Sequence, residues 1–195
     1  MRRVRAGGRC DDGAVERVSV VGNSGSGKTA LARRLAALIG APSVELDGHR
    51  HQAGWTELSD DDLRARVAEL CAGDRWVVDG NYDAVRDLVW ARADTVVWID
   101  LPRWRVTARV VRRSAWRLAT RTELWNGNRE HLRAVLSRDP ARSPVVASFV
   151  GHPGLRRCYA AARLDPAHRH LRFVRLTTPA AVRRFLAVTA AGRRT

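Results

Sequence analysis

The chain has 195 residues, enough for one domain with a sizeable core, and its 35 basic and 20 acidic side chains give a formal net charge of +15. No apolar run is long enough to span a membrane and the first residues lack the apolar core of a secretory signal, so we expect no membrane partner and a cytoplasmic location. Cys10, Cys71 and Cys158 show no metal-binding or redox spacing and are expected to be reduced thiols.

The positive charge is spread unevenly along the chain. Residues 41–100 carry 6 basic and 13 acidic side chains, whereas residues 101–164 carry 14 and 3. A basic half of this kind could bind nucleic acid without regard to sequence, could close arginines over a polyphosphate, or could be a solvated surface. Composition leaves these three interpretations open.

The first elements of the chain predict a strand, a glycine-rich loop and a helix. Residues 1–16 are basic and lack hydrophobic periodicity, so we expect a flexible tail before a single domain over residues 17–195. A short buried strand is expected over residues 18–21. A helix is expected over residues 30–39, and Gly40 marks its end.

The segment between that strand and that helix fits the phosphate-binding pattern G-x-x-x-x-G-K-[ST]; its residues are Gly22, Asn23, Ser24, Gly25, Ser26, Gly27, Lys28 and Thr29. Glycines let successive backbone N–H groups point inward around a phosphate. Lys28 is the only lysine in the chain, which indicates that this position requires a primary ammonium to reach the phosphates of ATP. Thr29 would offer its hydroxyl to Mg²⁺. The correct flanking elements disfavour a chance glycine-rich turn.

Strands and helices alternate through the rest of the chain. Further strands are expected over residues 43–46, 76–78, 95–99 and 171–176. Helix starts are indicated by a capping-box-like Ser59 and Asp62, by Ser143-Pro144 and by Thr178-Pro179, whereas residues 151–154, which contain Pro153, predict a helix break. The alternation predicts an α/β fold, with a five-stranded parallel sheet flanked by helices.

The helix expected over residues 103–119 has two distinct faces. An apolar stripe with helical spacing predicts the core-facing side; its members are Trp104, Ala108, Val111, Ala115 and Leu118. Another face is cationic and carries Arg105, Arg109, Arg112 and Arg113. A polar loop over residues 120–129 and a short helix ending near residue 137 follow.

Two aspartates follow predicted strands, where open α/β sheets place their ligands. Asp79 could hold Mg²⁺ directly or through water beside the Thr29 hydroxyl, or it could cap the next helix. Asp47 could take a proton from an acceptor hydroxyl, or it could cap its own loop. His49 and His51 lie nearby without a third firm metal ligand, so we interpret them as surface residues.

These motifs together resemble adenylate-kinase-type P-loop kinases, and above all the small bacterial P-loop proteins labelled adenylate kinase or DNA topology modulation protein. The shared features are the P-loop, Leu46-Asp47, Gly54-Trp55, the run from Trp76 to Tyr82, and the spacing of Arg109 and Arg113. The resemblance implies a nucleoside-monophosphate-kinase-like P-loop NTPase fold with strand order 2-3-1-4-5 and a short arginine-rich lid over about residues 103–142. It also implies that Arg109 and Arg113 clamp the transferring phosphoryl group, and that Asp47 orients the acceptor as in shikimate-kinase-like enzymes.

The chain departs from adenylate kinases on the acceptor side. Asn81-Tyr82 replaces the Phe-Pro-Arg that supplies a phosphate-gripping arginine; Arg50 or Arg86 could stand in for it, and the acidic segment over residues 41–100 favours a weakly charged acceptor. The loop aromatics that could stack on a base are Trp55, Tyr82 and Trp125, and Arg129 could enter the site from the loop. We therefore expect a monomeric kinase that transfers a phosphoryl group from ATP, with Mg²⁺, to a nucleotide or small metabolite. The alternative is a nucleotide-dependent nucleic-acid-binding or regulatory protein.

Overall fold

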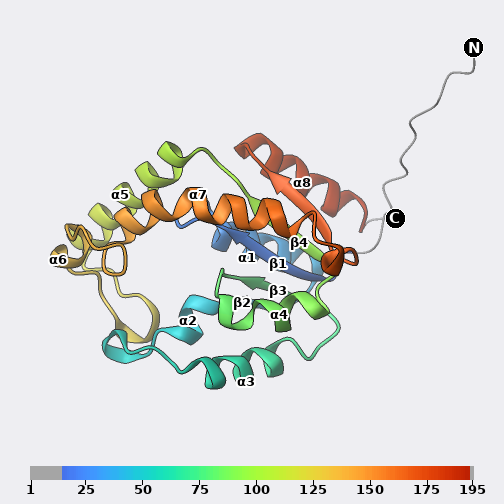
Figure 1. The fold of residues 1–195 in the computed structure, drawn as a ribbon, viewed down its shortest axis with the longest axis horizontal. Coiled ribbons are helices and arrows are strands. Elements are labelled where there is room, and N and C mark those ends of the chain that lie inside the picture. Colours follow the sequence, from blue (N-terminus) through green and yellow to red (C-terminus); the bar gives the residue numbers. More distant parts are fainter. Residues whose placement is uncertain (1–14, 194–195) are drawn as a thin grey trace, which may run out of the picture.

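The computed structural model describes residues 15–193 and contains a five-stranded parallel sheet with the order β2-β3-β1-β4-β5 (Figure 1). The strands are β1 (Arg17–Gly22), β2 (Ser43–Glu45), β3 (Trp76–Asp79), β4 (Thr95–Ile99) and β5 (Arg172–Leu176). The predicted fold class and the strand order implied by the resemblance are confirmed. The predicted tail lies outside the described residues except for its last two positions.

Helices connect the strands and cover both faces of the sheet. They are α1 (Lys28–Ile39), α2 (Leu46–Arg50), α3 (Asp60–Leu70), α4 (Asp83–Arg92), α5 (Arg103–Thr120), α6 (Leu132–Val135), α7 (Pro144–Ala162) and α8 (Pro179–Ala191). Three single 3₁₀ turns are η1 (Ala53–Trp55), η2 (Trp125–Gly127) and η3 (Pro166–His168). None of the helices within residues 15–193 is long and apolar enough to cross a membrane.

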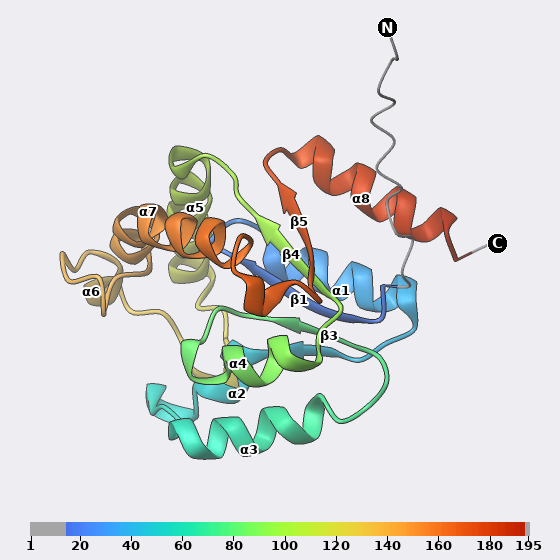
Figure 2. The same ribbon diagram turned by 45° about the vertical axis from the view of Figure 1, so that its right-hand side comes forward.

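The core has two layers, one on each face of the sheet. Helices α1 and α8 cover one face, where Leu35 and Ile39 pack against the strand valines, and α3, α4 and α7 cover the other (Figure 2). The second layer is aromatic and contains Trp76, Trp90 and Tyr159. β3 and β4 are buried along their whole length, and apart from Thr95 and Asp79 their sequences are apolar rather than alternating.

The predicted core face of α5 is wrong. Val106, Val110 and Ser114 are buried, whereas Trp104 is 67% exposed and Val111 is 47% exposed. Residues 104 and 106 point about 200° apart on a helix, so the two candidate stripes lie on opposite sides. The stripe with Val106 and Val110 is buried because it packs against Gly25 of the loop after β1.

The predicted break in α7 is also wrong. The helix runs without interruption through Pro153, although proline removes one backbone hydrogen bond from a helix interior. Three residues on one face are buried on both sides of the proline; these are Ser148, His152 and Tyr159. The His152 ring lies 2.9 Å from the Leu101 carbonyl oxygen, and such contacts stabilise the helix across the defect.

The predicted helix starts are confirmed. The hydroxyls of Ser59, Ser143 and Thr178 each accept a hydrogen bond from a backbone N–H three residues on, at 3.1, 3.3 and 3.1 Å. At the second strand the boundary differs from the prediction, because Leu46 begins α2 instead of ending β2. Asp47 is therefore presented by a helical turn at the carboxyl edge of the sheet, beside the ends of β1 and β3.

Candidate active site

The glycine-rich loop after β1 adopts a backbone that only glycine tolerates well. Gly25 and Gly27 have φ values of 79° and 98°, and a Cβ on Gly25 would lie 2.4 Å from the Val106 carbonyl oxygen of α5. Lys28 is the first residue of α1, and its Nζ donates to the Asn23 carbonyl at 3.3 Å. The loop therefore curls at the start of a 12-residue helix, where backbone N–H groups and the helix dipole favour an anion.

Two asparagines hold this loop in place. The Asn81 side chain bonds both the N–H and the carbonyl of Gly22, with the N–H donating to Oδ1 at 3.0 Å, and the Tyr159 hydroxyl donates to the same oxygen at 3.0 Å. The Asn23 side chain donates to the Ser148 carbonyl of α7 at 2.6 Å. The sequence indicated Asn81 only as a departure from adenylate kinases, because its partner lies 59 positions away.

Thr29 and Asp79 meet behind the loop. The Thr29 hydroxyl donates to Asp79 Oδ2 at 2.5 Å, and Asp79 is 4% exposed. Burial raises the pKa of the Asp79 carboxyl, while the nearby Lys28 ammonium and the Thr29 hydrogen bond lower it. Asp79 does not cap α4, whose N-cap position is Tyr82.

This pair fits a magnesium ion. The second oxygen of Asp79, Oδ1, is buried and has no hydrogen-bond partner among residues 15–193. A buried carboxylate oxygen next to a hydroxyl is a ligand set that Mg²⁺ uses in phosphate-binding sites. The metal role predicted for Asp79 and Thr29 therefore has a physical basis in the orphaned oxygen.

Helix α5 brings its arginine pair to the loop. Arg109 donates to the Ser26 carbonyl at 3.3 Å, and Arg113 donates to the Ser24 hydroxyl at 3.2 Å. Burial lowers the pKa of Arg113, the neighbouring Arg117 adds to this, and the Arg113 Nε has no partner among the described residues. A buried guanidinium without a contacting carboxylate is suited to an anionic ligand.

Asp47 lines the same cleft as Ser24 of the glycine-rich loop. Its Oδ1 accepts a hydrogen bond from the Tyr82 hydroxyl at 2.8 Å, and the His51 ring lies 3.4 Å from the same hydroxyl. Burial and the Asp47 charge raise the pKa of Tyr82, so this phenol stays a donor at neutral pH. Tyr82 therefore orients Asp47, a role that the sequence did not suggest.

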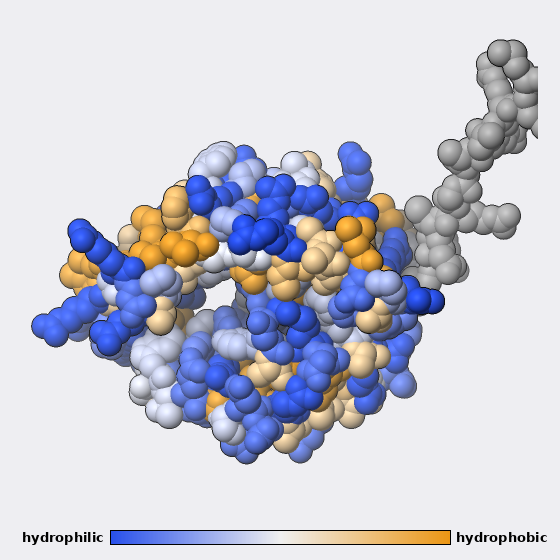
Figure 3. Space-filling view, in the orientation of Figure 1, coloured by the Kyte–Doolittle hydropathy of each residue, from blue (hydrophilic) through white to orange (hydrophobic). Residues whose placement is uncertain are grey.

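One cleft of about 740 Å³ joins these groups. Ser24, Asp47 and Arg113 border it together, and Figure 3 shows the molecule hollowed in this region, with an opening bordered by α6, α7 and the loops around η1 and η2. Most of its remaining wall comes from residues 124–147, of which the sequence suggested only Trp125 and Arg129 for the site.

The two arginines suggested for the acceptor side do not line this cleft. Arg50 bonds Glu57 at 2.8 Å and also Asp60. Arg86 pairs with Asp83 and stacks 5.6 Å from the Trp90 ring centre. Both guanidinium groups are occupied elsewhere. The expected replacement for the phosphate-gripping arginine of adenylate kinases is therefore absent at these positions.

The loops around η1 and η2 are hydrogen-bonded to each other across the cleft; we call this contact the clasp. Asn128 is buried, donates to the Gln52 carbonyl at 2.8 Å and accepts from the Trp55 N–H at 2.9 Å. Asn126 donates to the His51 carbonyl at 2.5 Å. The clasp joins the two segments that border the acceptor end of the cleft.

A second, outer cavity of about 410 Å³ lies on the far side of Arg109; Trp104, Arg105, Ala108, Arg112 and Pro179 complete its lining. Because Arg109 also donates to the Ser26 carbonyl, this outer cavity adjoins the glycine-rich loop. The outer cavity holds the tryptophan that the sequence assigned to the core.

Comparison with known proteins supports the fold and is silent on the substrate. Residues 18–100 match the family model described as ATPase family associated with various cellular activities (AAA). A shikimate kinase from Bacteroides thetaiotaomicron matches with TM-score 0.52 and 11% identity, covering 92% of this chain and 99% of its own. A shikimate kinase from Acinetobacter baumannii, in complex with shikimate, matches with TM-score 0.56 and 15% identity, covering 93% and 96%. No curated protein matches the sequence.

The glycine-rich loop and the sheet order together give the chain a P-loop fold, and the AAA family model matches it over residues 18–100. Its α/β architecture is that of the small P-loop kinases, as in the shikimate kinases. At these identities the likeness describes the fold alone.

Proposed function

We propose that this protein transfers the terminal phosphoryl group of ATP, with Mg²⁺, to a hydroxylated small molecule. The observation that carries the proposal is that a single cleft is bordered by Ser24 of the phosphate-binding loop, by Arg113 and by Asp47. A phosphoryl donor and an acceptor hydroxyl would meet there, with a cation and a carboxylate already in place.

The donor side is built from the loop and α1. The loop N–H groups and Lys28 would hold the phosphates of ATP. Mg²⁺ would be held by Thr29 and Asp79, and it would offset the charge of the phosphate oxygens. The purine ring would lie in the outer cavity between Trp104 and Pro179, because that cavity adjoins the loop through Arg109.

The acceptor side is built from Asp47 and the arginines. The acceptor oxygen attacks the γ-phosphorus, its proton passes to Asp47, and the bond from the γ-phosphorus to ADP breaks. Tyr82 keeps the Asp47 carboxylate oriented. Arg109 and Arg113 stabilise the charge that spreads over the transferring phosphoryl oxygens, so catalysis comes mainly from positioning and electrostatics.

The test is an ADP-release screen with ATP and Mg²⁺ over nucleoside monophosphates, nucleosides and small hydroxylated metabolites. We expect acceptor-dependent ADP release that is abolished in Lys28→Ala, with the circular dichroism spectrum unchanged. Lys28 is the sole lysine, so no neighbouring ammonium can substitute for it. Wild-type turnover in the folded variant would contradict the proposal.

Nucleic-acid binding is the second candidate, and one observation favours it. Trp104 and Trp116 of α5 are both largely exposed, and the Arg105 guanidinium lies 5.2 Å from the Trp104 ring centre. Exposed aromatic rings among arginines are the features that single-stranded nucleic acid binds by stacking and charge.

A further inference from the structure

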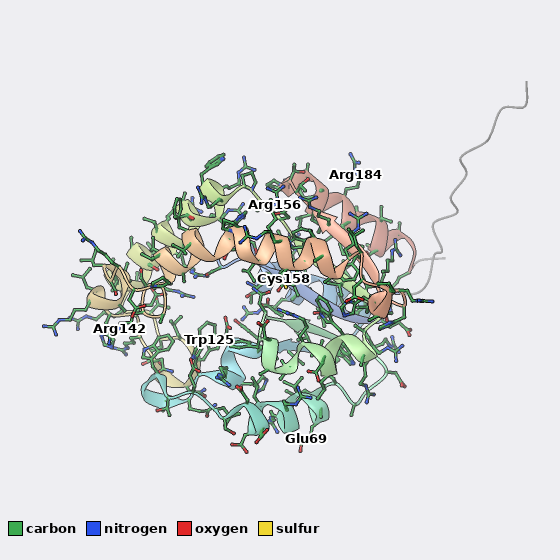
Figure 4. All side chains as sticks on the ribbon, viewed as in Figure 1. Glu69, Trp125, Arg142, Arg156, Cys158 and Arg184 are labelled. Atoms are coloured by element: carbon green, nitrogen blue, oxygen red, sulfur yellow. The ribbon has the colours of Figure 1, made fainter. Side chains whose placement is uncertain are left out.

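At the acceptor end of the cleft, the clasp closes the surrounding chain segments into a continuous border, which we call the ring. The chain passes from α5 through η2 and α6 to α7 above the cleft, and the clasp joins η2 to the segment after α2 below it. Figure 4 shows Trp125 at the edge of this opening and Arg142 farther out, on the side of α6. An acceptor therefore enters between α7 and the clasp, with its reacting end toward Asp47 and its other end toward α6.

The cleft inside the ring is too large for a very small acceptor to contact all of its walls. Its volume of about 740 Å³ is in the upper part of the range for pockets that hold drug-sized ligands, roughly 300–1,000 Å³. A small polyol would leave most of this wall without contact. The cleft is therefore matched to an elongated acceptor.

One wall of the ring is aromatic. The ring centres of His51 and Trp55 lie 5.4 Å apart, those of His51 and Trp125 lie 6.0 Å apart, and all three side chains line the cleft. The Trp55 indole N–H donates to the Arg129 carbonyl at 3.1 Å, which fixes that ring in place. Immobilised rings of this kind present a stacking surface for a planar group.

The charged side chains in the middle of the cleft wall are paired, whereas those at its two ends are not. Arg117 and Glu130, which both line the cleft, pair with each other at 2.6 Å. The other two charged residues of this part, Glu57 and Arg129, pair with Arg50 at 2.8 Å and with Glu123 at 2.7 Å. At the inner end, neither Asp47 nor Arg113 forms an ion pair within residues 15–193, although the charges of Asp47 and Glu130 act on Arg113 from a longer distance.

At the outer end the unpaired charge is positive. Arg133 makes no ion pair in the part of the chain that the structure describes, and Arg142 makes only a loose one with Asp139 at 3.6 Å. Both line the cleft, as does His131. This positive end favours an anionic acceptor over the weakly charged one expected from the acidic residues 41–100, because the outer wall comes from the basic segment after α5.

We propose, resting on the kinase function above, that the acceptor is an elongated compound with three parts in order: a hydroxyl at Asp47, a planar ring against Trp55 and Trp125, and an anionic group near Arg133 and Arg142. The hydroxyl oxygen forms the new bond to the γ-phosphorus, its proton goes to Asp47, and ADP leaves. Asp47 Oδ2 makes no hydrogen bond among the described residues and so faces the cleft free to accept that proton.

The test uses four probes built on one plan. 4-(Hydroxymethyl)benzoate carries a hydroxyl, a planar ring and an anion in that order; benzyl alcohol lacks the anion, 6-hydroxyhexanoate lacks the ring, and 4-methylbenzoate lacks the hydroxyl. We expect the highest kcat/KM for 4-(hydroxymethyl)benzoate. In Arg133→Ala/Arg142→Ala its KM should rise at least tenfold while that of benzyl alcohol stays unchanged, and the exposed Arg138→Ala should change neither.

Binding is measured separately by tryptophan fluorescence with saturating ADP and Mg²⁺, so that the result does not depend on turnover. Equal affinity for benzyl alcohol and 4-(hydroxymethyl)benzoate, or an equal loss for both in the double variant, would overturn the inference. If the binding order holds but no probe supports ADP release, the kinase function fails and not the shape of the site. If a polyol without ring or anion is the best acceptor, the kinase function stands and the inference falls.

Discussion

At the scale of single residues, burial separates the proposed catalytic charges from the rest of this arginine-rich chain. Many of its ion pairs have at least one partner in solvent, such as Arg33–Glu45 at 2.9 Å, and such pairs contribute little to stability. Asp79 and Arg113 are different, because each makes no ion pair among residues 15–193 and also holds a buried polar atom with no hydrogen-bond partner there. Arg17 and Glu130 hold such an atom too, but each of them is in an ion pair. Unpaired buried charge costs stability, so its presence at one end of the sheet is a mark of ligand binding.

Asp79→Asn should weaken the use of Mg²⁺ while leaving β3 packed, because the amide is nearly isosteric with the carboxylate. Burial raises the pKa of Asp79, so the carboxyl takes up a proton at a higher pH than an ordinary aspartate does. As the pH falls toward this pKa, the Mg²⁺ concentration for half-maximal turnover should rise in the wild type. In the variant it should be high at every pH. An unchanged metal dependence would leave Asp79 with a structural role only.

Arg113→Ala should act on the transition state more than on binding. The guanidinium stabilises charge that spreads over the γ-phosphoryl oxygens during transfer, so kcat should fall by about 10²-fold or more, with a smaller rise in the ATP KM. Arg157→Ala, an exposed arginine on α7, is the matched control and should keep wild-type kinetics. A change confined to KM would indicate ground-state binding alone.

At the scale of elements, local pattern predicted which segments are helical but not which faces are buried. The stripe through Trp104 and Val111 has ideal helical spacing, yet α5 buries Val106 and Val110, because the phosphate-binding loop comes within contact distance of that side. Pro153 predicted a break that contacts elsewhere in the fold override. Both errors have one cause: long-range packing decides between local alternatives of similar free energy.

Gly48 lies in α2 next to Trp125 of the clasp region, so Gly48→Ala tests whether the position of that aromatic wall matters for the acceptor. A Cβ there would lie 2.9 Å from Cδ1 of Trp125, so the aromatic wall must shift although alanine favours a helix. We expect the acceptor KM to rise roughly tenfold or more, since small displacements of a positioned acceptor are costly, and the ATP KM to stay the same. Gly151→Ala in α7, where nothing lies within 4 Å, is the control. An equal effect on both KM values would mean a general loss of structure.

At the scale of the whole molecule, the fold was predictable and the acceptor site was not. The strand–loop–helix pattern at the start of the sequence and the alternation of strands and helices after it are enough to predict the parallel sheet. The bounds predicted for the fourth strand agree with β4. The cleft depends on contacts between distant segments, such as Asn128 with Gln52 across 76 positions, which no local pattern reveals. The roles of Lys28, Asp47 and the arginines stay predictions that the geometry supports.

The net charge of +15 leads to a prediction for the whole surface. If nucleic acid binds only through unspecific charge, retention of the protein on single-stranded DNA should fall steeply between about 50 and 200 mM salt, and added DNA should not change ADP release. Double replacement of Trp104 and Trp116 by alanine should leave retention unaltered. Salt-resistant binding that requires these tryptophans would favour the nucleic-acid function instead.

Because Lys28, at the start of α1, is the only lysine in the sequence, amine-directed reagents can label the protein selectively at that side chain. The Lys28 side chain is half-buried, donates to the Asn23 carbonyl and forms no ion pair among residues 15–193, although its charge acts on the nearby Asp79. Apart from an amino terminus, an amine-directed probe has a single side chain of this sequence to react with, and that side chain lies in the proposed nucleotide site. Occupancy of the site can thus be followed by mass spectrometry as protection of one residue, whatever the acceptor is.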